Sequence, residues 1–380
     1  MPEINPNQFK EVSNESWLSR IGGSFIGFLI GIILIPAMIF LLSWNEGRAV
    51  SSAKSLNLGR SAVVEVSSET MDPSNEQKLI YVVGQLTTQV PAVDPLTNLT
   101  VDNLVRLKRD VSIYQWVEKV VEKKTENVGG SQTTEKEYNY SKDWSSQPID
   151  SRNFKIPAGH QNPKIDISSE SFDADEANLG VFSFKPMLET LQNYETLSQL
   201  PNPPEGFEIS GSSYYKGKDI NKPEIGDVKI NYSGIVGQKY SIVAQQSEES
   251  LTPFVDPKTD YSIALVKSGQ VSVDKLFAEQ ENQEKIETWA LRALGFVFMV
   301  VGFKLLFGPI EMLAAFLPFL KHLIGAGTFV VSLLRAVPDT LITIAIAWIS
   351  NRPLISVAML VISLIFGFLF YKRSQSKKIN

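Results

Sequence analysis

The sequence predicts a multi-pass α-helical membrane protein of about four spans, with a large β-rich α+β domain outside the membrane between the first and second spans. An apolar run without any charge covers residues 21–43, and the next long apolar runs come only after residue 288. The stretch between them is polar and alternates as strands do. About 20 apolar residues at ~1.5 Å rise cross the ~30 Å hydrocarbon core. We therefore expect an integral protein of the lipid bilayer.

The average composition hides this division. Of 380 residues, 43% are hydrophobic and 20% are charged, as in ordinary soluble proteins. The net charge of −5 is too small to indicate an acidic or basic partner, and no basic patch predicts binding to nucleic acid. The absence of cysteine excludes disulfides, thiol catalysis and Cys-ligated metals.

Four spans are predicted along the chain, at residues 21–43, 289–307, 324–350 and 353–371. The first could instead be a cleaved signal peptide with a site near Ala49, but its apolar stretch is longer than a signal peptide requires.

Residues 308–323 are too short and too charged to span, with Glu311, Pro318 and Lys321. They indicate an interfacial or re-entrant segment, or else an extension of the second span.

Basic residues near the span ends predict the orientation. The tail 372–380 and the segment with Lys321 and His322 are basic, so both are expected in the cytosol. An even number of spans then places residues 1–20 in the cytosol and residues 44–288 in a lumen, a periplasm or outside the cell.

Within 44–288, alternation with period two predicts several strands. They lie at residues 78–86, 105–117, 137–144, 227–232 and 240–244, with a hairpin tip at 123–132. Apolar residues at helical spacing predict a helix over 184–200. A second, long helix is expected to start after Ser272 and to continue unbroken into the second span.

No catalytic motif, metal site or cofactor site is predicted. The acidic group Asp173, Asp175 and Glu176 lacks the pattern of a calcium loop and indicates a solvated turn. His160 lies in a turn-rich stretch and is the only candidate for a third hypothesis, a lumenal enzyme.

Two features lie within the apolar runs. Arg335 and Asp339 are four residues apart in the third span, so they share a helix face and can pair as a polar intramembrane site or as a contact between helices. Small residues at Gly23, Gly27 and Gly31 indicate close helix packing.

Short motifs follow one another in order from the end of the first span. They contain Asn45, Glu46, Gly47 and Arg48; Tyr114, Gln115 and Trp116; His160, Asn162 and Pro163; Trp289 and Arg292; and Arg352 and Pro353. Together these motifs resemble the LUMA family, also called the transmembrane protein 43 family.

The resemblance implies four spans, cytosolic or nucleoplasmic termini, a lumenal domain and no enzymatic activity. It also implies self-association and binding to other membrane or envelope proteins. We therefore expect a scaffold or adaptor, in the endoplasmic reticulum and inner nuclear membrane of a eukaryote or the plasma membrane of a bacterium. The alternative is an ion channel or transporter whose polar path includes Arg335 and Asp339.

Overall fold

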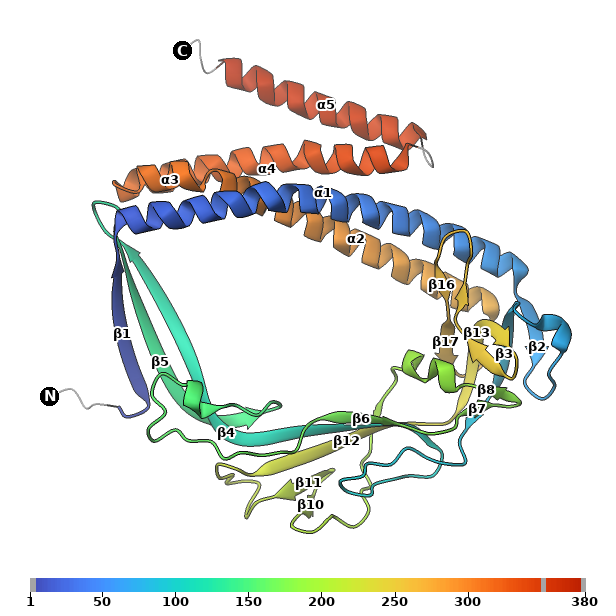
Figure 1. The fold of residues 1–380 in the computed structure, drawn as a ribbon. Coiled ribbons are helices and arrows are strands. Elements are labelled where there is room, and N and C mark those ends of the chain that lie inside the picture. Colours follow the sequence, from blue (N-terminus) through green and yellow to red (C-terminus); the bar gives the residue numbers. More distant parts are fainter. Residues whose placement is uncertain (1–4, 350–352, 377–380) are drawn as a thin grey trace. The chain divides into compact units, whose positions relative to one another are not determined.

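The computed structural model describes residues 5–349 and 353–376, and its chain forms two compact units. The described parts of Met1–Lys10, Ser55–Val121 and Glu137–Gln280 make up the first unit, and those of Glu11–Lys54, Glu122–Lys136 and Glu281–Asn380 the second. Several long helices and strands begin in one unit and end in the other (Figure 1).

The larger of two main sheets has the strand order β1-β5-β4-β12-β11-β10, with β6 beside β4 and β9 beside β12. Its strands are β1 (Gln8–Glu15), β4 (Leu104–Glu126), β5 (Gln132–Ser145), β6 (Glu170–Asp173), β9 (Glu195–Thr196), β10 (Glu208–Ser210), β11 (Ser213–Lys216) and β12 (Val228–Val236).

The second sheet has the order β17-β13-β14-β8-β7-β3-β2, with β13 also paired to β3. Its strands are β2 (Val64–Ser67), β3 (Leu79–Thr87), β7 (Asn178–Leu179), β8 (Phe182–Ser183), β13 (Lys239–Ser247), β14 (Ser250–Thr252) and β17 (Leu265–Ser268). β15 (Phe254–Val255) and β16 (Ser262–Ile263) form a separate pair.

The strands predicted from alternation are confirmed. Along β4, buried and half-buried side chains alternate from Leu107 to Gln115, because one face of the strand packs on the core. Antiparallel pairing sets Tyr232 opposite Arg109 and Val228 opposite Ile113. The hairpin tip is confirmed too, since β4 ends at Glu126 and β5 begins at Gln132.

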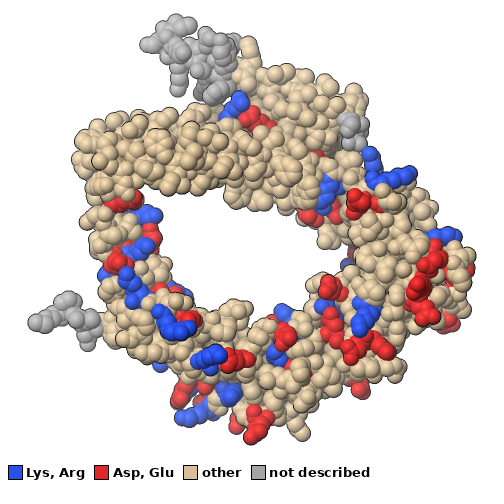
Figure 2. Space-filling view, in the orientation of Figure 1, with Lys and Arg blue, Asp and Glu red and all other residues tan. Residues whose placement is uncertain are grey.

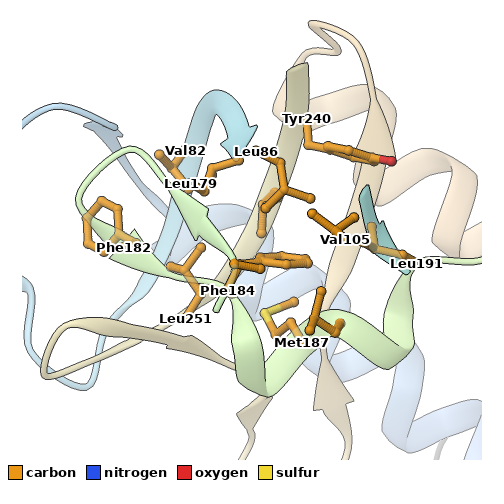
Figure 3. Packing of buried hydrophobic residues seen from close by; sticks show 14 of the residues in the cluster. Val82, Leu86, Val105, Leu179, Phe182, Phe184, Met187, Leu191, Tyr240 and Leu251 are labelled. Carbon is orange, nitrogen blue, oxygen red and sulfur yellow. The ribbon is translucent and has the colours of Figure 1, made fainter. Parts of the chain in front are cut away.

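The largest core of the first unit fills the space beside the second sheet (Figure 3). Phe182, Phe184 and Met187 have no exposed surface and pack against Val82 and Leu86 of β3. Burying each such side chain stabilises the fold by ~1.5–3 kcal/mol. The β-rich domain therefore holds together by apolar burial, as a chain without cysteine requires.

The prediction of an α-helix over residues 184–200 is wrong. A 3₁₀ helix covers Lys185–Thr190, and the residues between it and β9 form no helix. Because a 3₁₀ helix repeats every three residues, Leu188 and Leu191 lie on one face, and both are in the core together with Met187.

The helices are α1 (Trp17–Ala62), α2 (Val273–Leu306), α3 (Gly308–Ala314), α4 (Pro318–Trp348) and α5 (Pro353–Ser376). In the described part of the chain, α1, α2 and α4 are long and apolar enough to cross a membrane, and α5 is a shorter apolar helix. The protein is thus a membrane protein with a large β-rich domain. Figure 2 shows few charged residues over the helices and many over the strands.

The long helix expected after Ser272 is confirmed, since α2 runs unbroken for 34 residues. Residues 308–323 hold the short helix α3 and the start of α4. The predicted span limits and the side of the membrane for each segment stay predictions.

Candidate functional site

A buried carboxylate joins three helices of the second unit. Glu46 of α1 has no exposed surface, and its two oxygens accept hydrogen bonds of 2.7 Å from Nε and Nη2 of Arg292 on α2. Nε1 of Trp348, the last residue of α4, donates to the same carboxylate at 2.5 Å. A two-pronged arginine–carboxylate pair is among the strongest and most directional contacts in proteins.

Aromatic rings enclose the cation of this cluster. The Arg292 guanidinium lies 4.7 Å from the ring centre of Trp289 and 5.4 Å from that of Trp348. Such contacts contribute ~0.5–2 kcal/mol, more when water is excluded. The Trp348 side chain therefore contacts both partners of the ion pair, because its N–H donates to Glu46 and its ring face lies against Arg292.

Neighbouring residues of α1 and α2 extend the contact. Nδ2 of Asn45 donates to the Thr288 carbonyl oxygen at 3.1 Å, and Nη1 of Arg48 lies 2.7 Å from Glu284. Glu284, Thr288 and Arg292 are four residues apart, so they line one face of α2. We call Asn45, Glu46, Arg48, Glu284, Thr288, Arg292 and Trp348 the polar clasp.

The chemistry of the polar clasp indicates a structural role. An arginine stays charged under all physiological conditions, so it neither transfers protons nor binds a metal cation. Both oxygens of Glu46 are engaged by donors. The arrangement fixes how α1, α2 and α4 pack.

A second polar group lies where α2, α3 and α4 meet. Nζ of Lys304 pairs with Glu311 and donates to the Gly325 carbonyl oxygen at 2.9 Å and to Thr328 Oγ1 at 2.8 Å. Thr328 also donates to Glu311. These contacts tie α3 to both long helices.

The glycines of the first apolar run differ in their surroundings. A Cβ added to Gly31 would lie 2.7 Å from the carbonyl oxygen of Gly302 on α2, whereas Gly27 has only one contact, at 3.5 Å, and Gly23 has nothing within 4 Å. Gly295 and Gly302 likewise face Leu42 and Ile35 of α1. Close approach of α1 and α2 therefore involves Gly31 with two glycines of α2.

The predicted intramembrane pair forms on α4. Nε of Arg335 lies 3.1 Å from Oδ2 of Asp339, and 64% of the Arg335 side chain is exposed. It makes no contact with the polar clasp that the structure records, and we treat it as a separate feature of the α4 surface.

The motif residues of the first unit hold loops to the larger sheet. Oδ1 of Asn162 accepts the backbone N–H of Trp116 at 2.7 Å, and its Nδ2 donates to the Trp116 carbonyl oxygen at 3.0 Å. Nε2 of Gln115 donates to the Gln147 carbonyl oxygen at 2.6 Å, and its Oε1 accepts the backbone N–H of Ile149 at 3.0 Å. Tyr114 packs on Trp144 with 5.3 Å between ring centres.

His160 is enclosed by neutral groups. Its Nδ1 lies 3.0 Å from the Ile156 carbonyl oxygen and its Nε2 lies 3.1 Å from Oδ1 of Asn7. Its ring stacks on Tyr140 with 4.0 Å between centres. Burial and a hydrogen bond to Glu118 raise the pKa of Tyr140 to about 12. The site has the features of a packed aromatic core.

Four predicted motif residues remain to be placed. Gly47 faces open space, Pro163 approaches Gly226, and Pro353 begins α5. Arg352 lies outside the described residues. Within 5–349 and 353–376, no group of three His, Asp or Glu side chains is arranged to hold a metal ion; the absence of a cofactor stays a prediction.

Sequence reasoning missed Trp348, Lys304 and Glu311 as polar partners, and Gly295 and Gly302 as packing residues. The seven-residue spacing of the two glycines is a signal of a shared helix face that could have found them. Nothing in the sequence pairs Glu46 with Trp348, because 302 positions separate them.

Residues 113–353 match the family described as transmembrane protein 43. The chain belongs to the transmembrane protein 43 family. It is 28% identical to transmembrane protein 43 of Homo sapiens over 98% of this chain and 96% of that protein. It is 29% identical to the transmembrane protein 43 homolog of Drosophila melanogaster over 87% of this chain and 90% of that protein.

No solved structure matches the chain. The names of these transmembrane protein 43 relatives describe membrane proteins and state no enzymatic activity. The alignment with the human protein includes nearly the whole chain and so takes in both sides of the polar clasp.

Proposed function

We propose that this transmembrane protein 43 family member is a non-enzymatic membrane scaffold that self-associates and organises membrane or envelope protein complexes. The observation that carries the proposal is the polar clasp, in which the fully buried Glu46 is locked between Arg292 and Trp348. Partners of a complex need a surface of fixed shape, and a buried, satisfied ion pair of this kind specifies one packing of helices.

The helices offer apolar surface for such partners. On α5 the side chains of Leu354, Leu364 and Phe368 are 86%, 70% and 63% exposed, and on α1 Phe40 is 73% exposed. In a bilayer, lipid tails or other helices cover these side chains, and helix association depends on close packing. The polar clasp keeps α1 in place, so its outer face keeps one shape.

Self-association is tested by producing two copies of the chain with different tags in the same cells. Extraction in mild detergent and purification on one tag are expected to recover the other copy. The matched control is mixing of the two extracts after solubilisation, which should recover far less. Recovery of single-tagged monomers from co-producing cells would contradict the scaffold proposal.

Localisation follows the same reasoning. We propose the endoplasmic reticulum and inner nuclear membrane if the host is a eukaryote, and the plasma membrane with an exported domain if it is a bacterium. Imaging of a tagged copy beside a compartment marker tests this, and a uniformly soluble distribution would contradict it.

A channel or transporter is the second candidate, and the Arg335–Asp339 pair favours it. This ion pair lies on an apolar helix, with Pro338 between its members and the Arg335 side chain 64% exposed. Charged groups on membrane helices often mark ion pathways. The test is conductance of reconstituted protein, which a pore predicts to change in Arg335→Leu; equal currents in both proteins would oppose it.

A further inference from the structure

Three Asn-x-Ser/Thr sequences occur in the first compact unit. They begin at Asn98, Asn139 and Asn231, and none has proline at its middle position. This tripeptide is the acceptor sequence for asparagine-linked glycans, which are added to exported domains. A glycan is bulky and hydrophilic, so a folded domain accommodates it only where the asparagine side chain faces water. The surroundings of the three asparagines therefore decide which of them can carry one.

Asn98 lies in a surface turn between β3 and β4. Asn98 and Thr100, the first and third residues of its acceptor sequence, are both exposed. The Asn98 N–H donates to the Asp94 carbonyl oxygen at 2.8 Å, and Asp94 pairs with Leu99 as an isolated antiparallel bridge. Asn98 has φ +52°, a left-handed conformation that asparagine adopts more readily than most residues. The turn therefore presents both required residues of the acceptor sequence to solvent.

The base of this turn is anchored in the core. Asp94 has no exposed surface, and Nη1 of Arg109 donates to its carboxylate at 2.5 Å. The Tyr232 hydroxyl donates to the same carboxylate. Leu99 has no exposed surface either, and it belongs to a core cluster with residues of β4 and β12. A glycan on Asn98 would leave these contacts intact, because the Asn98 side chain is exposed while its neighbours hold the turn.

The other two asparagines lie within strands. Asn231 is in β12, opposite Ser213 of β11 and Asp110 of β4, so strands flank it on both edges. Its Oδ1 accepts a hydrogen bond from Oγ of Ser213 at 2.5 Å, which holds the side chain against the sheet. Asn139 is half-buried in β5. A sugar on Nδ2 of either asparagine would compete for space with side chains of the neighbouring strands.

Exposed apolar side chains lie on the same loop as Asn98. Val90, Val93 and Leu96 are 47%, 42% and 43% exposed. Apolar side chains grouped at a surface favour association with other proteins. A glycan on Asn98 would place a large hydrophilic group beside them and reduce their contact with other chains. The loop thus has a physical use for the modification as well as room for it.

We propose that Asn98 is a site of asparagine-linked glycosylation and that Asn139 and Asn231 carry no glycan. The site requires a lumenal β-rich domain, and so rests on the localisation proposed for a eukaryotic host. The donor is an oligosaccharide joined through a diphosphate to a lipid carrier. Nδ2 of Asn98 forms a bond to C1 of the first sugar, and the bond between C1 and the diphosphate oxygen breaks. The lipid diphosphate leaves with the electron pair, and the amide proton passes to a base of the transferase.

The test is the electrophoretic mobility of the full-length chain made in cultured animal cells, before and after peptide-N-glycosidase treatment. Wild type is expected to shift by the mass of one glycan. Asn98→Gln and Thr100→Ala should abolish the shift, whereas Thr100→Ser, which keeps the acceptor sequence, should retain it. Asn139→Gln and Asn231→Gln should shift as wild type does. A glycan that persists in Asn98→Gln and is lost in either strand variant would overturn the proposal.

An added acceptor sequence distinguishes failure of the site from failure of the localisation. Pro223→Thr completes an acceptor sequence at the exposed Asn221, in the loop between β11 and β12. The variant is expected to carry two glycans, and one when it is combined with Asn98→Gln. A glycan on Asn221 without one on Asn98 would overturn the proposed site while supporting a lumenal domain. A chain without any glycan in the Pro223→Thr variant would contradict both the lumenal placement and the site.

Discussion

Breaking the ion pair of the polar clasp tests its energetic role. Glu46→Leu leaves the Arg292 cation, with a side chain only 13% exposed, without its carboxylate. Arg292→Met leaves Glu46 with no exposed surface and no cation. Removal of one partner from a buried pair costs about 3–5 kcal/mol, so each single variant should lose that much stability.

The double variant distinguishes a pair from two independent contacts. Two apolar side chains in place of a buried ion pair are often neutral, so Glu46→Leu with Arg292→Met should lose about 0–2 kcal/mol rather than the sum of the singles. The assay is unfolding in mixed micelles of mild detergent and dodecyl sulfate. The matched control is Lys164→Ala, whose partner Asp166 is 3.1 Å away with both side chains exposed, and it should lose about 0–1 kcal/mol.

Two results would refute this reasoning. Single variants as stable as the Lys164→Ala control would mean that the buried charges are already solvated or unpaired. A double variant whose loss equals the sum of the two singles would mean that Glu46 and Arg292 do not interact.

The remaining predictions concern other contacts. Gly31→Ala should lower stability in the same assay by about 1–3 kcal/mol, because its Cβ would meet the Gly302 carbonyl oxygen at 2.7 Å, whereas Gly23→Ala has open space and should not; equal effects would contradict the packing. Hydrogen bonds from the Ser55 hydroxyl and the Lys258 N–H lower the pKa of Asp256 in the folded protein. The ionised carboxylate therefore stabilises the fold at any pH above its unfolded pKa of ~3.9. This stabilisation is lost as the pH falls through the lower pKa of the folded protein. Thermal midpoints of wild type and Asp256→Asn should therefore differ at pH 7 and converge towards pH 3; a gap that widens on acidification would be the wrong sign. Lys304→Met should destabilise the protein more than Lys164→Ala, because it leaves Glu311 without its cation; equal unfolding curves would show that the Lys304 contact is not formed.

The sequence predicted the strands well where one face packs on a core. In β4 and β12 the alternation follows burial directly, so period two is visible in the residues themselves. β1 carries no such signal, because only two of its side chains are even half-buried. Its place beside β5 depends on backbone pairing, which composition does not encode.

The error over 184–200 has a similar origin. Apolar residues three or four apart suit an α-helix, but the same spacing suits a 3₁₀ turn that directs Met187 and Leu188 into the core. Only the surrounding sheet decides between them, and a single sequence does not show the sheet.

The candidate site was partly visible in advance. Glu46 and Arg292 were selected as motif residues, yet their pairing needed the antiparallel packing of α1 and α2. Trp348 was missed because an aromatic residue near a span end is ordinarily explained by the membrane interface. Its hydrogen bond to Glu46 depends on where α4 ends, which sequence patterns predict poorly.

The most direct measurement for the account is the mass of the protein in lipid nanodiscs, determined by light scattering for wild type and for Glu46→Leu. We expect wild type to be multimeric, and the Glu46→Leu variant to shift towards the monomer while its β-rich domain keeps the wild-type circular dichroism. A wild-type protein that is monomeric in nanodiscs would contradict a scaffold built on locked helices.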